Sequence, residues 1–188
     1  MDKYKKLASN TIIFAIGSFG AKFLSFFLVR LYSKFIDTAG FGIKELIETT
    51  ANFIIPVVTF CMADAIIRYG LKKTYSKKKI FTSAAIMMLV GLTGLAFLSP
   101  LFNLLSFLDG YGFLLYLYIF CSCFRSLCSN FVRSQGYVKL FAADGIFATF
   151  MLLVFNIIFI AICKLGVTGF LISVILSDFV SGLTLTLV

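Results

Sequence analysis

The chain has 188 residues, of which 61% are hydrophobic and 13% charged, and its mean hydropathy is +1.04. Soluble domains are roughly half apolar and a quarter charged, so this composition excludes a soluble globular protein and favours an integral membrane protein. Apolar runs long enough to cross about 30 Å of hydrocarbon recur along the sequence and leave no room for a separate soluble domain. We therefore predict one all-α, polytopic transmembrane domain over residues 1–188.

The first ten residues, MDKYKKLASN, are basic and precede an apolar run, as they would in a signal peptide. That run is too long for a signal peptide and has no small-residue cleavage site before Lys22, so we expect a retained first helix. Hydropathy then predicts six membrane spans, near residues 10–29, 45–67, 80–105, 112–132, 141–163 and 167–188.

The basic residues of the connections are distributed unevenly between the two sides of the membrane. One set of connections holds Lys3, Lys5, Lys6, Arg68, Lys72, Lys73, Lys77, Lys78, Lys79, Arg133 and Lys139. The opposite set holds Arg30, Lys34, Lys44 and Lys164. We expect Arg30, Lys34 and Lys44 at an interface or in solvent. Because short cytoplasmic loops are enriched in Lys and Arg, the pattern predicts that both termini are cytoplasmic.

The net charge of +9 follows this alternation of loops, so no nucleic-acid partner is expected. The loop LKKTYSKKK, residues 71–79, also predicts contact with the anionic headgroups of membrane lipids. The sixth run ends at Val188 without a polar flank. We therefore expect either the amino-terminal lobe of a longer protein or a half-transporter whose other half is a second chain.

An arginine lies near the middle of the fourth predicted span, in LYIFCSCFRSLCSNFVRSQG. A guanidinium at that depth costs about 2.5–3.5 kcal/mol, so Arg125 is expected to face the protein interior. Ser122, Ser129 and Arg133 share its helix face. Asp178 in the sixth span lies at a comparable depth, and it is either the ion-pair partner of Arg125 or an independent cavity residue.

Polar stripes also mark the second and sixth spans. In the second span Glu45, Glu48 and Asn52 share a face with Pro56, which is expected to kink the helix. The sixth span aligns Ser173, Ser177, Ser181 and Thr184. Such inward polar faces favour a water-accessible cavity and a transport function, although a scaffold without transport activity is an alternative.

The charges and motifs narrow the class of function further. Lys22 and Arg125 outnumber Asp178 inside the predicted spans, which favours an anionic substrate such as a phosphate or pyrophosphate, although Lys22 can also extend its flexible side chain to an interface. The chain contains no histidine, and its five cysteines fall in or at the ends of apolar runs. We therefore predict no enzyme activity, no cofactor and no metal site.

Three segments carry a resemblance to a known family. They are NTIIFAIGSFGAKFLSFFLVRLYSKF, AGFGIKELIETTANFIIPVVTFCMADAIIRYGLKK and FVRSQGYVKLFAADGIF. Together they resemble the amino-terminal half of polysaccharide transporters, the Wzx-type oligosaccharide flippases of the multidrug/oligosaccharidyl-lipid/polysaccharide superfamily. The likeness covers nearly the whole chain, but it consists of diffuse patterns rather than a catalytic signature.

The resemblance implies a bacterial inner-membrane protein with two helical lobes, which moves undecaprenyl-diphosphate-linked oligosaccharide to the outer leaflet by alternating access. It implies that cationic cavity residues engage the lipid diphosphate, and Lys22, Arg30, Arg125 and Arg68 fit that role. An alternative within the superfamily is a drug or metabolite antiporter coupled to protons or sodium, in which Glu45, Glu48 or Asp178 carries the ion. The candidate cavity residues are Arg125, Lys22, Arg30, Arg68, Glu48, Asn52 and Asp178.

Overall fold

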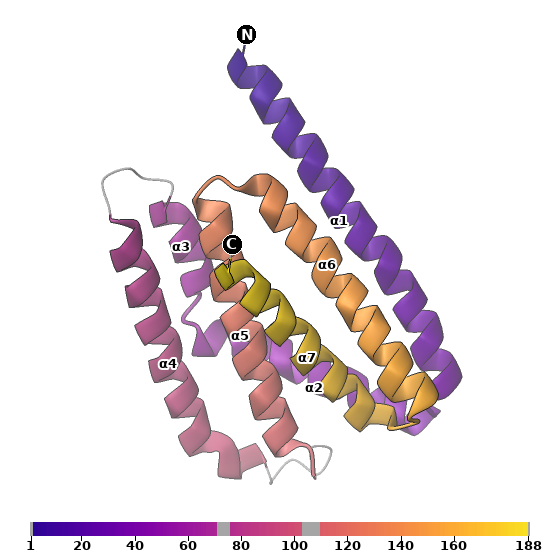
Figure 1. The fold of residues 1–188 in the computed structure, drawn as a ribbon. Helices are drawn as coiled ribbons and strands as arrows, with labels where there is room; N and C mark the ends of the chain where they lie inside the picture. The colour runs from indigo at the N-terminus through magenta and orange to yellow at the C-terminus, as the bar shows by residue number, and fades with distance from the viewer. Residues whose placement is uncertain (1, 71–75, 103–109, 188) are drawn as a thin grey trace.

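The computed structural model describes the backbone of residues 2–70, 76–102 and 110–187; the side chains described begin at residue 11 and omit 13–14, 16–18, 21, 63–64, 70 and 99–102. The described chain is a helical bundle with short connections (Figure 1). Its elements are α1 (Asp2–Phe35), α2 (Thr38–Val58), α3 (Met62–Gly70), α4 (Lys77–Phe102), α5 (Gly112–Ser134), α6 (Val138–Asn156), the π-helix η2 (Ile157–Ile162) and α7 (Gly166–Leu187).

Four stretches of the described chain are long and apolar enough to cross a membrane, which makes this a membrane protein. They are Lys77–Leu98 in α4, Gly112–Ser134 in α5, Val138–Ile162 in α6 with η2, and Gly166–Leu187 in α7. Each agrees with a span expected from hydropathy. The other two expected spans, 10–29 and 45–67, fall in α1 and in α2 with α3, so six spans remain a prediction.

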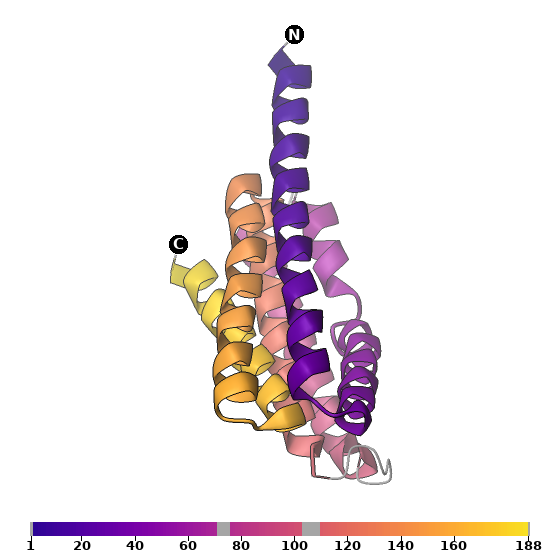
Figure 2. The same ribbon diagram turned by 90° about the vertical axis from the view of Figure 1, so that its right-hand side faces the viewer.

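The helices pack in an order that differs from their order in the chain. α1 lies along α6, and α7 packs against both α5 and α6 (Figures 1 and 2). α3 and α4 pack on the other side of α5. The beginning of α1, the end of α3, the beginning of α4 and the connection from α5 to α6 lie at the same end of the bundle, which we call the basic end (Figure 1). The eleven lysines and arginines predicted to be cytoplasmic lie in or next to these segments in the sequence.

The expected span 45–67 is not one continuous helix. α2 ends at Val58 and α3 begins at Met62, and between them Phe60 and Cys61 have φ angles of 49° and 51°. Pro56 has no backbone N–H, so the carbonyl of Asn52 loses its usual donor four residues later. At the end of α2 the backbone N–H and the hydroxyl of Thr59 both donate to the Ile55 carbonyl, at 3.0 and 2.8 Å. The sequence predicted a kink at Pro56; α2 continues through Pro56 to Val58, and the helix breaks at residues 59–61.

The broken end of α2 lies directly against α4. A Cβ atom built on Gly91 would lie 1.8 Å from the carbonyl oxygen of Val58, a distance that no side chain can occupy. Glycine is therefore required at this position by the backbone of α2, and not by the conformation of α4. At Gly94, in the next turn of the same helix, a Cβ atom would meet nothing within 4 Å.

These two glycines form a matched pair for a stability test. We expect Gly91→Ala to lower the thermal unfolding temperature of the detergent-solubilised chain, because the break between α2 and α3 must move away from α4. Gly94→Ala is expected to leave stability equal or raise it by up to about 1 kcal/mol, since alanine favours a helix interior over glycine. Equal unfolding temperatures for the two variants would contradict the close approach of Val58 to α4.

Candidate functional site

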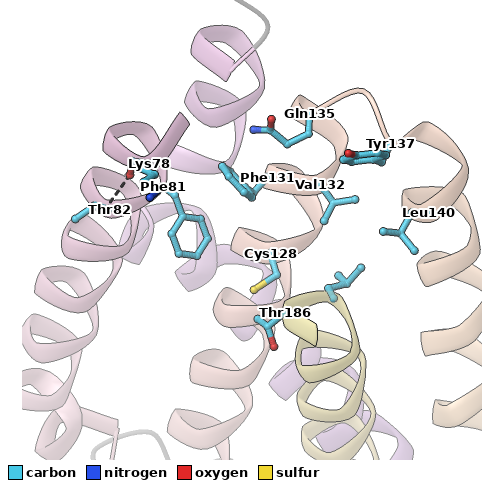
Figure 3. A pocket seen from close by; sticks show the side chains of 11 residues that line it. Lys78, Phe81, Thr82, Cys128, Phe131, Val132, Gln135, Tyr137, Leu140 and Thr186 are labelled. Carbon is cyan, nitrogen blue, oxygen red and sulfur yellow. Dashed lines mark hydrogen bonds between the residues drawn. The ribbon is translucent and has the colours of Figure 1, made fainter. Parts of the chain in front are cut away.

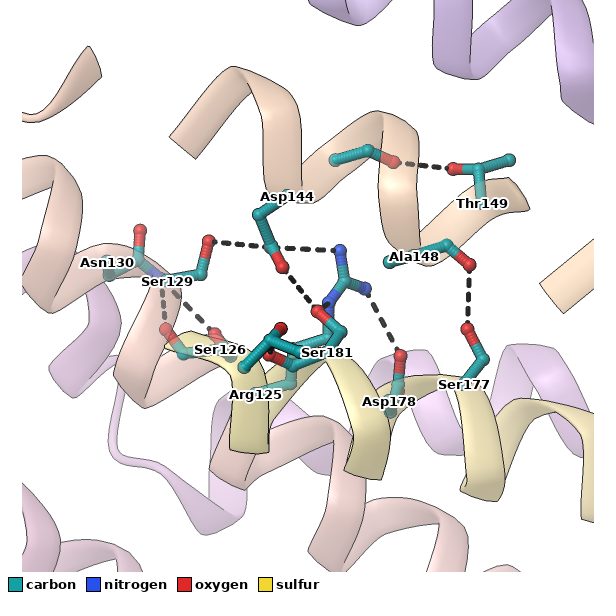
Figure 4. A network of polar contacts seen from close by, with 12 residues as sticks. Arg125, Ser126, Ser129, Asn130, Asp144, Ala148, Thr149, Ser177, Asp178 and Ser181 are labelled. Atoms are coloured by element: carbon teal, nitrogen blue, oxygen red, sulfur yellow. Dashed lines mark hydrogen bonds and ion pairs between the residues drawn. The ribbon is translucent and has the colours of Figure 1, made fainter. Parts of the chain in front are cut away.

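Arg125 lies in the middle of α5 and is bonded to two other helices. Its Nη1 atom is 3.2 Å from Oδ1 of Asp178 on α7, and its Nη2 atom is 3.5 Å from Oδ2 of Asp144 on α6. The third contact is a hydrogen bond of 2.9 Å from Nε to the hydroxyl of Ser181 on α7. One guanidinium therefore connects α5, α6 and α7, as Figure 4 shows.

Three serines complete the hydrogen bonding of the two carboxylates. The Ser122 hydroxyl donates to Oδ2 of Asp178, and the Ser181 hydroxyl donates to Oδ1 of Asp144. Ser129 donates to Oδ2 of Asp144 at 3.5 Å. Every carboxylate oxygen of the two aspartates thus has a partner, which is the arrangement that buried charge requires. We call Arg125, Asp144, Asp178, Ser122, Ser129 and Ser181 the arginine network.

The arginine network holds one cation and two anions in a largely dry environment. The side chains of Asp144 and Asp178 are 2% and 12% exposed, and that of Arg125 is 28% exposed. Charge buried in a medium of low dielectric is costly unless it is balanced. By formal charge the network therefore contains one more carboxylate than guanidinium, and Arg125 is its most exposed charged side chain.

Small residues on α7 bring the three helices close enough for these contacts. A Cβ atom on Gly182 would lie 2.7 Å from the ring of Phe124 on α5, so α5 and α7 approach closely there. Ser177 is buried and donates a hydrogen bond of 2.7 Å to the Ala148 carbonyl on α6. The predicted serine stripe of the sixth span is thus the face along which α7 packs, as small-residue faces commonly are in membranes.

A second charged cluster is centred on Lys44 of α2. The Lys44 ammonium lies 2.8 Å from Oε1 of Glu45 and 2.5 Å from Oε2 of Glu48. Three aromatic rings surround it, with the centroids of Tyr32, Phe41 and Phe170 between 4.9 and 5.7 Å away. Cation–π contacts of this kind stabilise a desolvated ammonium. The expectation that Lys44 is interfacial or solvated is wrong, since its residue exposure is 5%.

The structure brings together only some of the residues singled out from the sequence. Arg125 and Asp178 form an ion pair, which was one of the two alternatives left open by the sequence, and Glu48 belongs to the Lys44 cluster. The other four candidates are exposed and are not among the contacts of either charged cluster: Lys22, Arg30, Asn52 and Arg68. Asp64, the expected i, i+4 partner of Arg68, has a side chain outside the described residues.

Asp144 is the main residue that sequence reasoning missed. It lies four residues into the expected fifth span and is the only acidic residue in that span, which is the signal that identifies it. The prediction of an anionic cavity ligand compared Lys22 and Arg125 with Asp178 alone. Asp144 adds a second negative charge to that comparison. Among the described side chains of the arginine network, two carboxylates outnumber one guanidinium, so the expected cationic excess is not found at Arg125.

Comparison with protein-family models, with curated proteins and with solved structures gives no match for this chain. The resemblance to polysaccharide transporters therefore remains a prediction from the sequence. The function of the site must therefore be argued from its own chemistry. The arginine network is a hydrogen-bonded ion pair with one excess carboxylate, and it joins three membrane helices.

Removal of the Arg125 charge tests how much the arginine network contributes to stability. We expect Arg125→Met to lower the free energy of unfolding by about 3–5 kcal/mol, because it leaves two carboxylates buried without a cation. The same change at the exposed Arg133, whose guanidinium is 5.2 Å from the Phe141 ring, is expected to cost less than about 1 kcal/mol. Denaturant titration of the solubilised chain provides the measurement.

A triple variant separates lost charge balance from lost packing. Arg125→Met combined with Asp144→Asn and Asp178→Asn removes all three charges and nearly preserves side-chain volume. We expect it to recover most of the lost stability, since replacing a complete buried ion network is often nearly neutral. If the triple variant is less stable than Arg125→Met alone, the two carboxylates do not depend on Arg125 for charge balance.

Proposed function

We propose that this chain is the amino-terminal helical lobe of a membrane transporter, that its cargo is an anionic lipid-linked oligosaccharide, and that the arginine network couples transport to a cation. The observation that carries the proposal is the excess carboxylate beside Arg125 inside three apolar helices. Ionisable groups at such positions commonly lie on ion or substrate pathways. The resemblance to oligosaccharide flippases supports the choice of cargo.

The geometry supports a specific role for Arg125. Its three side-chain nitrogens each have a partner in the arginine network, so a lipid diphosphate must compete with Asp144 and Asp178 for the guanidinium. When a proton or a sodium ion neutralises one of these carboxylates, the attraction between that carboxylate and the guanidinium weakens. Arg125 then becomes available to the diphosphate, which it can bind through two parallel hydrogen bonds.

A cation-coupled antiporter of drugs or metabolites is the second candidate, and Asp144 is the observation that favours it. A site with two carboxylates and one guanidinium suits a cationic cargo better than the charge count from the sequence suggested. The two candidates share the coupling role of the arginine network and differ in the cargo. In either case we place the chain in a bacterial cytoplasmic membrane.

Asp144→Asn in the chromosomal gene tests coupling with little change in shape. We expect lipid-linked oligosaccharide to accumulate in membrane extracts and surface polysaccharide to fall at least tenfold, while the abundance of the protein in the membrane stays normal. Asp37→Asn, the same chemical change at an exposed position, is the control and should leave both quantities unchanged. Full export by the Asp144→Asn strain would contradict the coupling role.

The same strains distinguish the cargo. Unchanged surface polysaccharide together with increased sensitivity to cationic compounds would favour the antiporter and overturn the lipid-linked cargo. Arg125→Lys provides a second measure, because lysine keeps the charge but loses the planar arrangement of donors. For a diphosphate cargo we expect partial export with Arg125→Lys and none with Arg125→Met.

The orientation of the bundle is part of the proposal, with the basic end in the cytoplasm. Ser76 and Ala39 are exposed; Ser76 directly precedes α4 and Ala39 is the second residue of α2. The beginnings of α4 and α2 lie at opposite ends of the bundle (Figure 1). With the exposed Cys61 and Cys163 changed to serine, we expect a membrane-impermeant thiol reagent applied to intact cells to label Ala39→Cys and not Ser76→Cys. The reverse pattern would show that the basic end faces outward.

A further inference from the structure

A groove of about 750 Å³ opens at the basic end, between α4 and the ends of α5, α6 and α7 (Figure 3). Its size is within the range of pockets that hold small molecules and lipid chains. The arginine network does not line it. Its lining residues are Lys78, Phe81, Thr82, Cys128, Phe131, Val132, Gln135, Tyr137, Leu140, Leu185 and Thr186.

The inner and outer parts of this groove differ in chemistry. Apolar side chains such as Phe131, Val132 and Leu185 form most of the wall, and Cys128 and Thr186 lie at the inner end (Figure 3). Lys78 and Gln135 lie near the outer end, where α4 begins and α5 ends. An apolar interior with polar groups at its outer end is complementary to an amphiphilic ligand rather than to a fully water-soluble one.

The polar groups of the outer end are donors that favour an anion. Lys78 carries a positive charge, and none of the eleven lining residues is acidic. The Nε2 atom of Gln135 is buried and has no hydrogen-bond partner among the described residues. A buried N–H without an acceptor is costly, and a phosphate oxygen would satisfy it. Lys77 and Lys79 flank Lys78 in α4 and are exposed, but neither is among the lining residues.

We propose that the groove binds an anionic phospholipid of the surrounding membrane, with its phosphate at Lys78 and Gln135 and an acyl chain along Phe131, Val132 and Leu185. Basic pockets between the ends of membrane helices are typical sites for such headgroups. The bound chain would contact Cys128 and Leu185, which are within about one turn of Arg125 and Ser181 in their helices. The bound lipid thus fills the space between α4 and the ends of α5 and α7. This site is separate from the transport cargo and does not depend on its identity.

Native mass spectrometry of the purified chain tests the proposal, with dioleoylphosphatidylglycerol and dioleoylphosphatidylcholine supplied in equal amounts. We expect at least fivefold greater retention of phosphatidylglycerol. Lys78→Ala should reduce that preference about fivefold, as expected for one lysine near a lipid phosphate. Lys77→Ala makes the same charge change at an exposed neighbour outside the groove and should leave the preference unchanged. Leu140→Trp should fill part of the groove and reduce the retention of both lipids.

Three results would overturn the proposal. Equal retention of the two lipids would exclude recognition of an anionic headgroup. If Lys77→Ala and Lys78→Ala reduce the preference for phosphatidylglycerol equally, the preference comes from general electrostatic attraction by the lysines and not from the groove. Displacement of phosphatidylglycerol by an equal amount of undecaprenyl phosphate would assign the groove to a polyprenyl lipid instead. If Leu140→Trp does not purify as a monodisperse protein, the comparison of Lys77→Ala with Lys78→Ala decides the question by itself.

Discussion

The guanidinium of Arg125, held between two aspartates, is the interaction on which the rest of the bundle depends. It lies inside a helix that must enter a medium where an unpaired charge is costly, so α6 and α7 have to present their carboxylates at the same depth. Asp144 and Asp178 meet this requirement only if α5, α6 and α7 keep one relative register. The glycine and serines of α7 follow from the same need, because larger side chains would hold α7 away from α5 and α6.

The backbone irregularities of the bundle lie beside polar side chains. α2 stops near Thr59, whose hydroxyl and backbone N–H both donate to the Ile55 carbonyl one turn earlier. α6 continues into the π-helix η2 directly after Asn156, which is fully buried and donates from Nδ2 to the Leu152 carbonyl at 2.7 Å. Non-helical backbone is tolerated inside a membrane where other groups of the protein form hydrogen bonds with its free N–H and C=O groups. π-helical turns are also frequent at functional sites.

Hydropathy was sufficient to predict the four long membrane helices, because each is an apolar run bounded by short polar connections. Helical periodicity placed Arg125 on an inward face, and comparison of depths suggested Asp178 as its partner. Asp144 was missed because a single acidic residue in an apolar run has no periodic pattern around it. The burial of Lys44 was missed for a related reason, since its aromatic neighbours Tyr32 and Phe170 come from α1 and α7. The break after Val58 depends on the approach of Gly91, another contact between segments distant in sequence.

The central claim is that Arg125 and Asp144 stabilise each other across α5 and α6. A double-mutant cycle with Arg125→Met and Asp144→Asn, measured as free energies of unfolding in detergent, tests it directly. The account predicts a coupling energy above about 1 kcal/mol, because each change removes the charge that compensates the other. Effects that add within about 0.5 kcal/mol would contradict it, since that is the behaviour of residues that share no interaction.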